Sequence, residues 1–144
     1  MQTVADILSA KGNAVWTISP DTTVYDALRT MADKNVGALV VVAGEKILGL
    51  ISERDYARKV ILHGKSSREI TVTEIMTTQV HFVRLNQDIE ECMEQMTDKR
   101  VRHLPVMDND RLAGIISIGD VVKAIIDNQD ATIKHLENYI TGSR

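Results

Sequence analysis

Two runs of the same residue types mark where this sequence could do chemistry. The pattern Gly-x-Ile-Ser-x-x-Asp occupies residues 49–55 and again residues 114–120. Ser52 precedes Asp55 by three positions, as Ser117 precedes Asp120, which is the spacing of a capping box in the first turn of a helix. The same groups could bind a ligand, because a helix N-terminus attracts an anion and a carboxylate can accept hydrogen bonds from a ribose diol. The spacing leaves both interpretations open.

The sequence lacks the usual signatures of catalysis. Its four histidines are scattered, and it contains no HExxH motif, cysteine cluster, GxSxG motif or Walker-type glycine loop. We therefore expect a protein that is not an enzyme and holds no metal. A formal net charge of −3, with no basic face or aromatic platform, argues against a nucleic-acid partner.

Composition also bears on location. No run of 18 apolar residues is present, so no membrane contact is expected, and the N-terminus lacks the basic and apolar segments of a secretory signal. The single cysteine, Cys92, cannot form an internal disulfide, which fits a reducing cytoplasm. Cys92 shares an apolar helix face with Met93 and Met96, so we interpret it as a packing residue.

The chain repeats itself at an offset of 65 residues. Residues 31–36 (MADKNV) align with residues 96–101 (MTDKRV), and the match stays in register, without a gap, from about residue 15 to residue 61 of the first copy. Upstream, residues 4–8 resemble residues 72–76 at an offset of 68, so the first copy carries three extra residues around Lys11-Gly12-Asn13. Lys11 could approach a phosphate. This agreement at constant spacing indicates a duplication.

Each copy predicts the order β-α-β-β-α. The expected strands and hairpins cover residues 15–18, 38–42 and 46–52 in the first copy, and 80–83, 103–107 and 111–117 in the second. The closing helices are expected at residues 53–61 and 118–127. The predicted fold class is α/β (α+β), with two repeats packed by pseudo-twofold symmetry. We place the first repeat at 1–64, a linker at 65–71, the second repeat at 72–128 and a helical tail at 129–144.

The tail carries apolar residues at helical spacing. Ile133, Leu136 and Ile140 lie on one face, with Tyr139 beside them. This face could pack on its own domain or form a dimer contact.

The duplicated pattern resembles a pair of CBS (cystathionine β-synthase) domains, also called a Bateman module. The resemblance is carried by residues 15–24, 37–41 and 49–55 of the first copy and by residues 101–106 and 114–120 of the second, together with Leu28, Met31 and Met96. It covers nearly the whole chain, from Val4 to Ile126. The chain is therefore similar to the stand-alone bacterial type, which leaves no room for an attached catalytic domain.

The resemblance implies a sensor of adenosine-containing ligands. In this family AMP, ADP, ATP, NAD(H) or S-adenosylmethionine binds in clefts between the two copies, two chains pair as a homodimer, and a partner protein reads the change. By this resemblance Asp55 and Asp120 hold ribose hydroxyls, and Ser52 and Ser117 lie beside phosphate or ribose. The remaining residues that it implies border the adenine or the phosphate: Val15, Trp16, Thr17, Ala38, Arg54, Val80, His81, Arg102, His103, Leu104 and Pro105.

Several of these assignments have structural alternatives. Arg54 and Arg102 could be solvated surface charges, His103 a partly buried histidine, and Trp16 a core or interface residue. The basic pair Arg102-His103 has no counterpart in the first copy, where Gly37-Ala38 stands instead, so the two clefts are expected to differ in ligand preference. For the whole protein, the alternative to a sensor is a ligand-free dimerisation or scaffold module.

Overall fold

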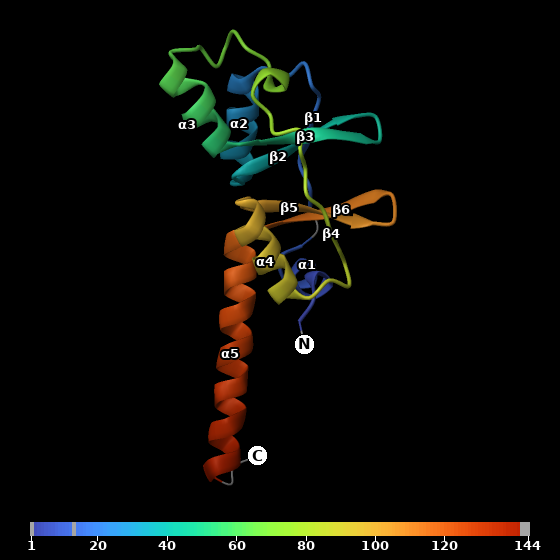
Figure 1. Cartoon of the computed structure of the whole chain (residues 1–144), viewed down its shortest axis with the longest axis vertical. Coiled ribbons are helices and arrows are strands. Elements are labelled where there is room, and N and C mark those ends of the chain that lie inside the picture. The colour runs from blue at the N-terminus through green and yellow to red at the C-terminus, as the bar shows by residue number, and fades with distance from the viewer. Residues whose placement is uncertain (1, 13, 142–144) are drawn as a thin grey trace. The chain divides into compact units, whose positions relative to one another are not determined.

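A computed structural model describes residues 2–12 and 14–141 of the chain. Its contacts divide the chain into two compact units. The repeat-1 unit is Ala14–His81, and the repeat-2 unit combines Met1–Asn13 with Phe82–Arg144. Each unit holds one three-stranded sheet with its helices, so the fold is mixed α/β as predicted (Figure 1).

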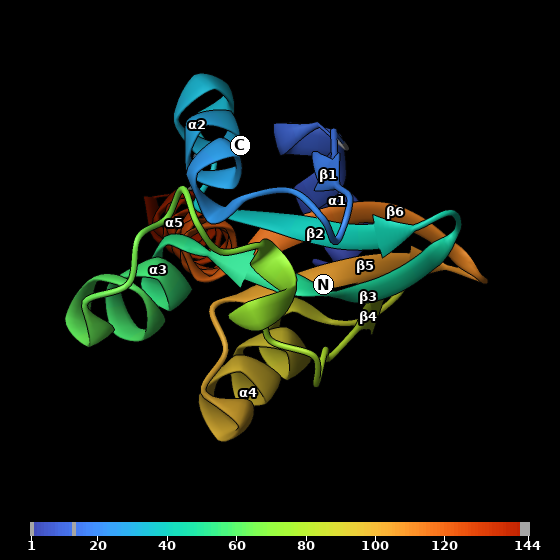
Figure 2. The same ribbon diagram turned by 90° about the horizontal axis from the view of Figure 1, so that it is seen from above.

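The repeat-1 unit is built on a hairpin. Its strands are β1 (Thr17–Ile18), β2 (Ala38–Ala43) and β3 (Lys46–Ser52), and its helices are α2 (Val24–Lys34), α3 (Glu53–Lys59) and the short 3₁₀ turns η1 (Ile61–His63) and η2 (Val72–Glu74). β1 runs parallel to β2, and β2 runs antiparallel to β3. Helices α2 and α3 lie at the end of this hairpin that is opposite its turn (Figure 2).

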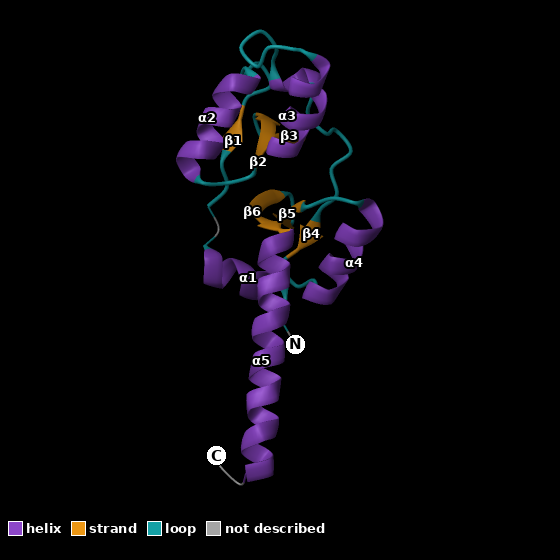
Figure 3. Cartoon of the chain, turned by 90° about the vertical axis from the view of Figure 1, so that its left-hand side faces the viewer, coloured by secondary structure: helices purple, strands orange, loops and turns teal. Residues whose placement is uncertain are grey.

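The repeat-2 unit has the same sheet. Its strands are β4 (Val83–Arg84), β5 (His103–Asp108) and β6 (Arg111–Ser117), and its helices are α1 (Val4–Lys11), α4 (Ile89–Lys99) and α5 (Ile118–Thr141). The hairpin has the same register as in repeat 1, since Gly114 pairs with Val106 as Gly49 pairs with Val41. A bulge follows each of these pairs at the equivalent place. Both α1 and α4 pack against α5 (Figure 3).

The secondary structure departs from the prediction mainly at the ends of elements. The strand expected at 15–18 is limited to Thr17–Ile18, and that expected at 80–83 begins only at Val83. α3 ends at Lys59 rather than at residue 61. Such shifts are usual, since strand and helix ends depend on pairing that local sequence does not specify.

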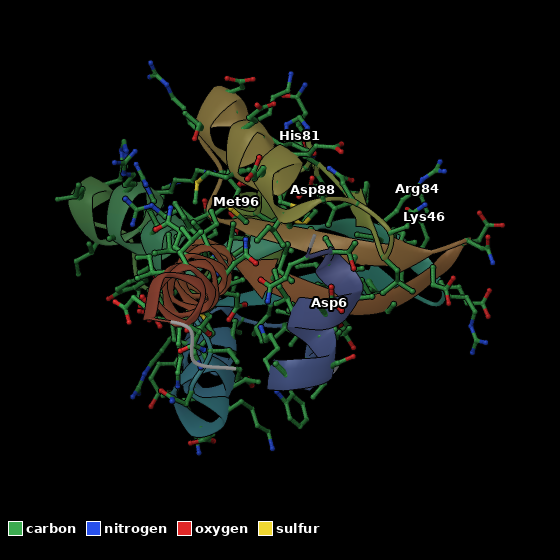
Figure 4. The ribbon with its side chains drawn as sticks, turned by 90° about the horizontal axis from the view of Figure 1, so that it is seen from below. Asp6, Lys46, His81, Arg84, Asp88 and Met96 are labelled. Atoms are coloured by element: carbon green, nitrogen blue, oxygen red, sulfur yellow. The ribbon has the colours of Figure 1, made fainter. Side chains whose placement is uncertain are left out.

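Both cores are aliphatic. Met31, Leu39 and Ile51 are fully buried in repeat 1, and their counterparts at an offset of 65, Met96, Leu104 and Ile116, are fully buried in repeat 2. Met96 lies on α4, whose first turn is capped by Asp88, with its carboxylate accepting a hydrogen bond from the Glu90 N–H at 3.1 Å (Figure 4).

Cys92 belongs to the same core. It is fully buried, and burial first, then the charges of Glu91 and Asp88, raises the pKa of its thiol to about 11. A thiol with so high a pKa is not reactive at neutral pH, which supports the packing interpretation.

The segment that precedes each repeat in the sequence belongs to the unit of the other repeat. α1 precedes the first repeat yet joins the repeat-2 unit, where the Val4 N–H donates to the Gln87 carbonyl at 2.9 Å. Residues 65–76, between the repeats, join the repeat-1 unit, where the Val72 N–H donates to the Thr22 carbonyl at 2.9 Å. The predicted division into 1–64 and 72–128 thus follows the sequence repeat, whereas the contacts group the chain differently.

α5 is one continuous helix of 24 residues. The sequence predicted a helix ending near residue 127 and a separate helical tail, but no glycine or proline interrupts residues 120–141 and the helix runs on. Ile126, Ile133 and Leu136 are each at least half exposed on it. The side chains of Tyr139 and Ile140, like residues 142–144, lie outside the part that the structure describes. None of the described helices is long and apolar enough to cross a membrane.

Candidate ligand site at the strand-to-helix junctions

The Ser-x-x-Asp motif of repeat 1 stands where β3 passes into α3. The backbone N–H and the hydroxyl of Ser52 donate to Asp55 Oδ2 at 3.0 and 3.1 Å, and the Asp55 N–H donates back to Ser52 Oγ at 3.2 Å. These bonds form a capping box that satisfies the free N–H groups at the helix start. The capping interpretation of the motif is therefore confirmed here.

Repeat 2 has the same junction between β6 and α5. The Ser117 N–H donates to Asp120 Oδ2 at 2.8 Å, and the Asp120 N–H donates to Ser117 Oγ at 3.1 Å. The capping bonds to the carboxylate fall on Oδ2 alone. Capping does not exclude a ligand, because the second oxygen of a carboxylate has its own lone pairs.

Each of the two aspartates is paired with a lysine. Lys59 Nζ lies 3.2 Å from Asp55 Oδ1 and donates to the Ile75 carbonyl at 2.9 Å. Lys11 Nζ lies 2.7 Å from Asp120 Oδ2 and donates to the Ile115 carbonyl at 3.0 Å. Lys59 was not among the residues predicted from the sequence, where its only signal is its i,i+4 spacing from Asp55. Lys11 was predicted only as a residue that could approach a phosphate, and its pairing with Asp120 was not expected.

The surroundings of Asp120 keep it ionised. Burial alone would raise the pKa of Asp120, but the hydrogen bond and charge of Lys11 and the hydrogen bonds from Ser117 together hold that pKa below its ordinary value. At neutral pH the side chain is thus a carboxylate and acts only as a hydrogen-bond acceptor. A partly buried carboxylate of this kind can accept bonds from sugar hydroxyls.

The first residue of each hairpin is paired, on the neighbouring strand, with the serine of the junction. Ala38 pairs with Ser52, and His103 pairs with Ser117. His103 is half-buried and interacts with a neighbour, whereas Ala38 is buried. The two junctions therefore differ at the position opposite the serine.

The other residues named from the sequence are placed as follows. Leu104 and Pro105 are buried, so they can offer a ligand only backbone groups, while Arg54 and Arg102 are exposed. Trp16 is 39% exposed, with the Lys34 ammonium 4.3 Å from its ring centre, so it is not a core residue. Val15, Thr17, Val80 and His81 are exposed or half-buried in the repeat-1 unit. No group of three or more metal-binding side chains occurs among residues 2–12 and 14–141.

Comparison with known proteins accounts for the duplicated junction. The sequence model of the CBS domain matches residues 4–62 and again residues 72–127. The chain belongs to the CBS domain family. CBS domain pairs are in general regulatory, ligand-binding modules, and proteins that consist of them alone are typically not catalytic.

Relatives and solved structures share this CBS pair. The mitochondrial CBS domain-containing protein CBSX3 of Arabidopsis thaliana is 39% identical over 150 residues, which cover 97% of this chain and 72% of the relative. A solved CBS-domain protein from Burkholderia ambifaria is 50% identical, with a TM-score of 0.85 over 89% of this chain and 96% of that one. The CBS domain pair of protein MJ0100, solved with 5′-methylthioadenosine and S-adenosylmethionine, is 22% identical, with a TM-score of 0.77 over 89% and 98%, and shares the fold.

Proposed function

We propose that this CBS pair is a non-catalytic sensor that binds an adenosine-containing ligand through Asp55 and Asp120 and controls a partner protein in the cytoplasm. The observation that carries the proposal is the duplicated junction, in which a capped helix start presents a partly buried carboxylate. The adenosine ligands bound by the MJ0100 pair support the class of ligand. The candidates are AMP, ADP, ATP, NAD(H) and S-adenosylmethionine.

The chemistry of the junction suits a nucleoside. A ribose has two neighbouring hydroxyls that donate to a carboxylate, as the acidic residue of a dinucleotide-binding fold accepts them. The exposed Arg54 and Arg102 offer planar donors for phosphate oxygens. Val15, Trp16, Thr17, Ala38, Val80, His81, His103, Leu104 and Pro105 are proposed to border the ligand, together with Ser52 and Ser117.

Thermal melting with a panel of ligands tests this function. A ligand that binds the folded state alone adds about 2.7 kcal/mol of stability at 100 times its dissociation constant. We expect at least one of AMP, ADP, ATP, NADH and S-adenosylmethionine to raise the melting temperature by several degrees. Asp55→Asn and Asp120→Asn should each reduce that rise, whereas Asp33→Asn, at an exposed position of α2, should not.

The scaffold function is the competing proposal. It is favoured by the exposed apolar residues of α5, which suit a contact with a second copy more than they suit water. If no ligand of the panel shifts the melting temperature, the sensor is rejected and the scaffold takes its place. A homodimer is compatible with both functions.

A further inference from the structure

Both junction aspartates are matched with a fixed positive charge. Each lysine ammonium contacts the carboxylate and also donates to a backbone carbonyl, Ile75 for Lys59 and Ile115 for Lys11. Two anchors hold each ammonium beside its carboxylate, although the lysine side chains are 46% and 35% exposed. The charge is therefore part of each junction and not a freely moving surface group.

The two repeats place this charge by different residues. Lys59 reaches Asp55 from α3, but its counterpart at an offset of 65 is Ala124. Lys11 reaches Asp120 from the end of α1, within the three-residue insertion that the second copy lacks. What the two junctions share is thus the ammonium at the carboxylate and not a common position in the repeat.

The hydrogen-bond partners of the two junctions show which group of repeat 1 Lys11 replaces. In repeat 1 the Thr77 N–H donates to the Leu50 carbonyl at 2.8 Å, and the Thr77 hydroxyl lies 3.5 Å from Asp55 Oδ1. Ile115 is the counterpart of Leu50, and its carbonyl receives the Lys11 ammonium instead. In repeat 2 the Lys11 ammonium therefore does what two groups do in repeat 1. It donates to the strand carbonyl, as the Thr77 N–H does, and it pairs with the aspartate, as Lys59 does.

We propose that Lys11 and Lys59 make the two aspartate junctions selective for anionic adenosine ligands, that is, nucleoside phosphates, over uncharged or cationic ones. The inference rests on the proposed function. A carboxylate that accepts ribose hydroxyls lies within about 10 Å of a 5′-phosphate, which is about one Debye length at 0.1 M ionic strength, so by itself it repels that phosphate. An ammonium on the same carboxylate cancels that repulsion. It gives no such advantage to adenosine, and it opposes the sulfonium of S-adenosylmethionine.

Adenosine and AMP form the matched pair of probes, since they differ only in the phosphate. Calorimetric titrations would use Asp55→Asn as the background, so that the Asp120 junction dominates the signal. In that background Lys11→Met should lower the affinity for AMP about tenfold relative to that for adenosine. Lys11→Arg keeps the charge and should preserve the wild-type ratio, as should Lys46→Met at an exposed residue of the β2–β3 hairpin (Figure 4).

The outcomes separate the two proposals. Equal losses for adenosine and AMP in Lys11→Met would overturn the selectivity and leave Lys11 as a positioning residue only. Unchanged affinities for both would also overturn it. Binding of neither probe by the wild-type protein would overturn the selectivity, whereas the sensor function itself is rejected only if no ligand of the melting panel binds. If Lys11→Met does not fold, the same ratio measured for Lys59→Met in an Asp120→Asn background decides the question.

Discussion

Asp120 caps its helix through one carboxylate oxygen. Its Oδ2 accepts from the Ser117 N–H and from Lys11. Asp55 differs, because Ser52 occupies its Oδ2 while Lys59 and Thr77 approach its Oδ1. If Asp55 binds a ribose as proposed, the ribose hydroxyl must therefore compete there with partners that occupy both carboxylate oxygens.

The lowered pKa of Asp120 predicts how its contribution to stability depends on pH. In the unfolded chain the carboxyl titrates near its ordinary value of 3.8, and in the folded protein it titrates lower. The stabilisation is therefore fully present above pH 3.8 and is lost as the pH falls through the folded pKa. Asp120→Asn should lower the free energy of unfolding at pH 7 by about 1 kcal/mol, through the weakened cap and the lost ion pair.

Urea denaturation at neutral and at acid pH checks this expectation. The difference between wild type and Asp120→Asn should shrink as the pH is lowered past the folded pKa. Asp98→Asn, at an exposed position in α4, should show little difference at either pH. A difference that grew on acidification would contradict the assignment of Asp120 as a stabilised carboxylate.

At the scale of elements, the repeat made most of the fold predictable. β3 and β6 run over the residues expected, because alternation and turn residues specify a hairpin locally. The place of α1 was not predictable, since nothing in residues 4–11 says which repeat they pack against. The pairing of Lys11 with Asp120 joins residues 109 positions apart, so no local pattern contains it.

The glycines of the two motifs predict unequal sensitivity to the same mutation. A Cβ at Gly49 would lie 2.5 Å from the Thr77 carbonyl oxygen, which is backbone held by its pairing with Leu50. A Cβ at Gly114 would lie 2.8 Å from Leu8 Cδ2, the end of a side chain that can rotate. Gly49→Ala should therefore cost about 3 kcal/mol of stability and Gly114→Ala about 1 kcal/mol. Equal losses in chemical denaturation would refute the distinction.

For the whole molecule, the exposed apolar face of α5 is the candidate contact of a homodimer. Ile126, Ile133 and Leu136 share one face of the helix and are 50%, 53% and 53% exposed. If two chains pair through this face, Ile133→Glu should convert a dimer of the wild-type protein to a monomer in light scattering at micromolar concentration. Lys134→Glu, an exposed neighbour outside this face, should leave the mass unchanged. A mass that Ile133→Glu does not alter would exclude this face as the contact.

The sequence could name the family and its aspartates, but it could not say what surrounds them. Leu104 and Pro105 are predicted to border the ligand, and both are buried in β5, the central strand of its sheet, so only their backbone groups remain for that role. For Trp16 the sequence allows a place in the core, at an interface or beside the ligand, and its exposure beside Lys34 excludes the core alone. Burial and long-range pairing depend on the folded chain, so they could not be predicted from local sequence motifs.

Asp55 and Asp120 are proposed to bind the ligand, and one calorimetric titration decides whether they do. The ligand that stabilises the protein most in the melting panel would be titrated calorimetrically into the double variant Asp55→Asn/Asp120→Asn and into Asp33→Asn/Asp98→Asn, a matched pair of exposed positions in the same repeats. The account predicts that the first variant loses at least about 100-fold in affinity while it stays folded, and that the second binds as wild type does. Unchanged affinity in the first variant would contradict the account.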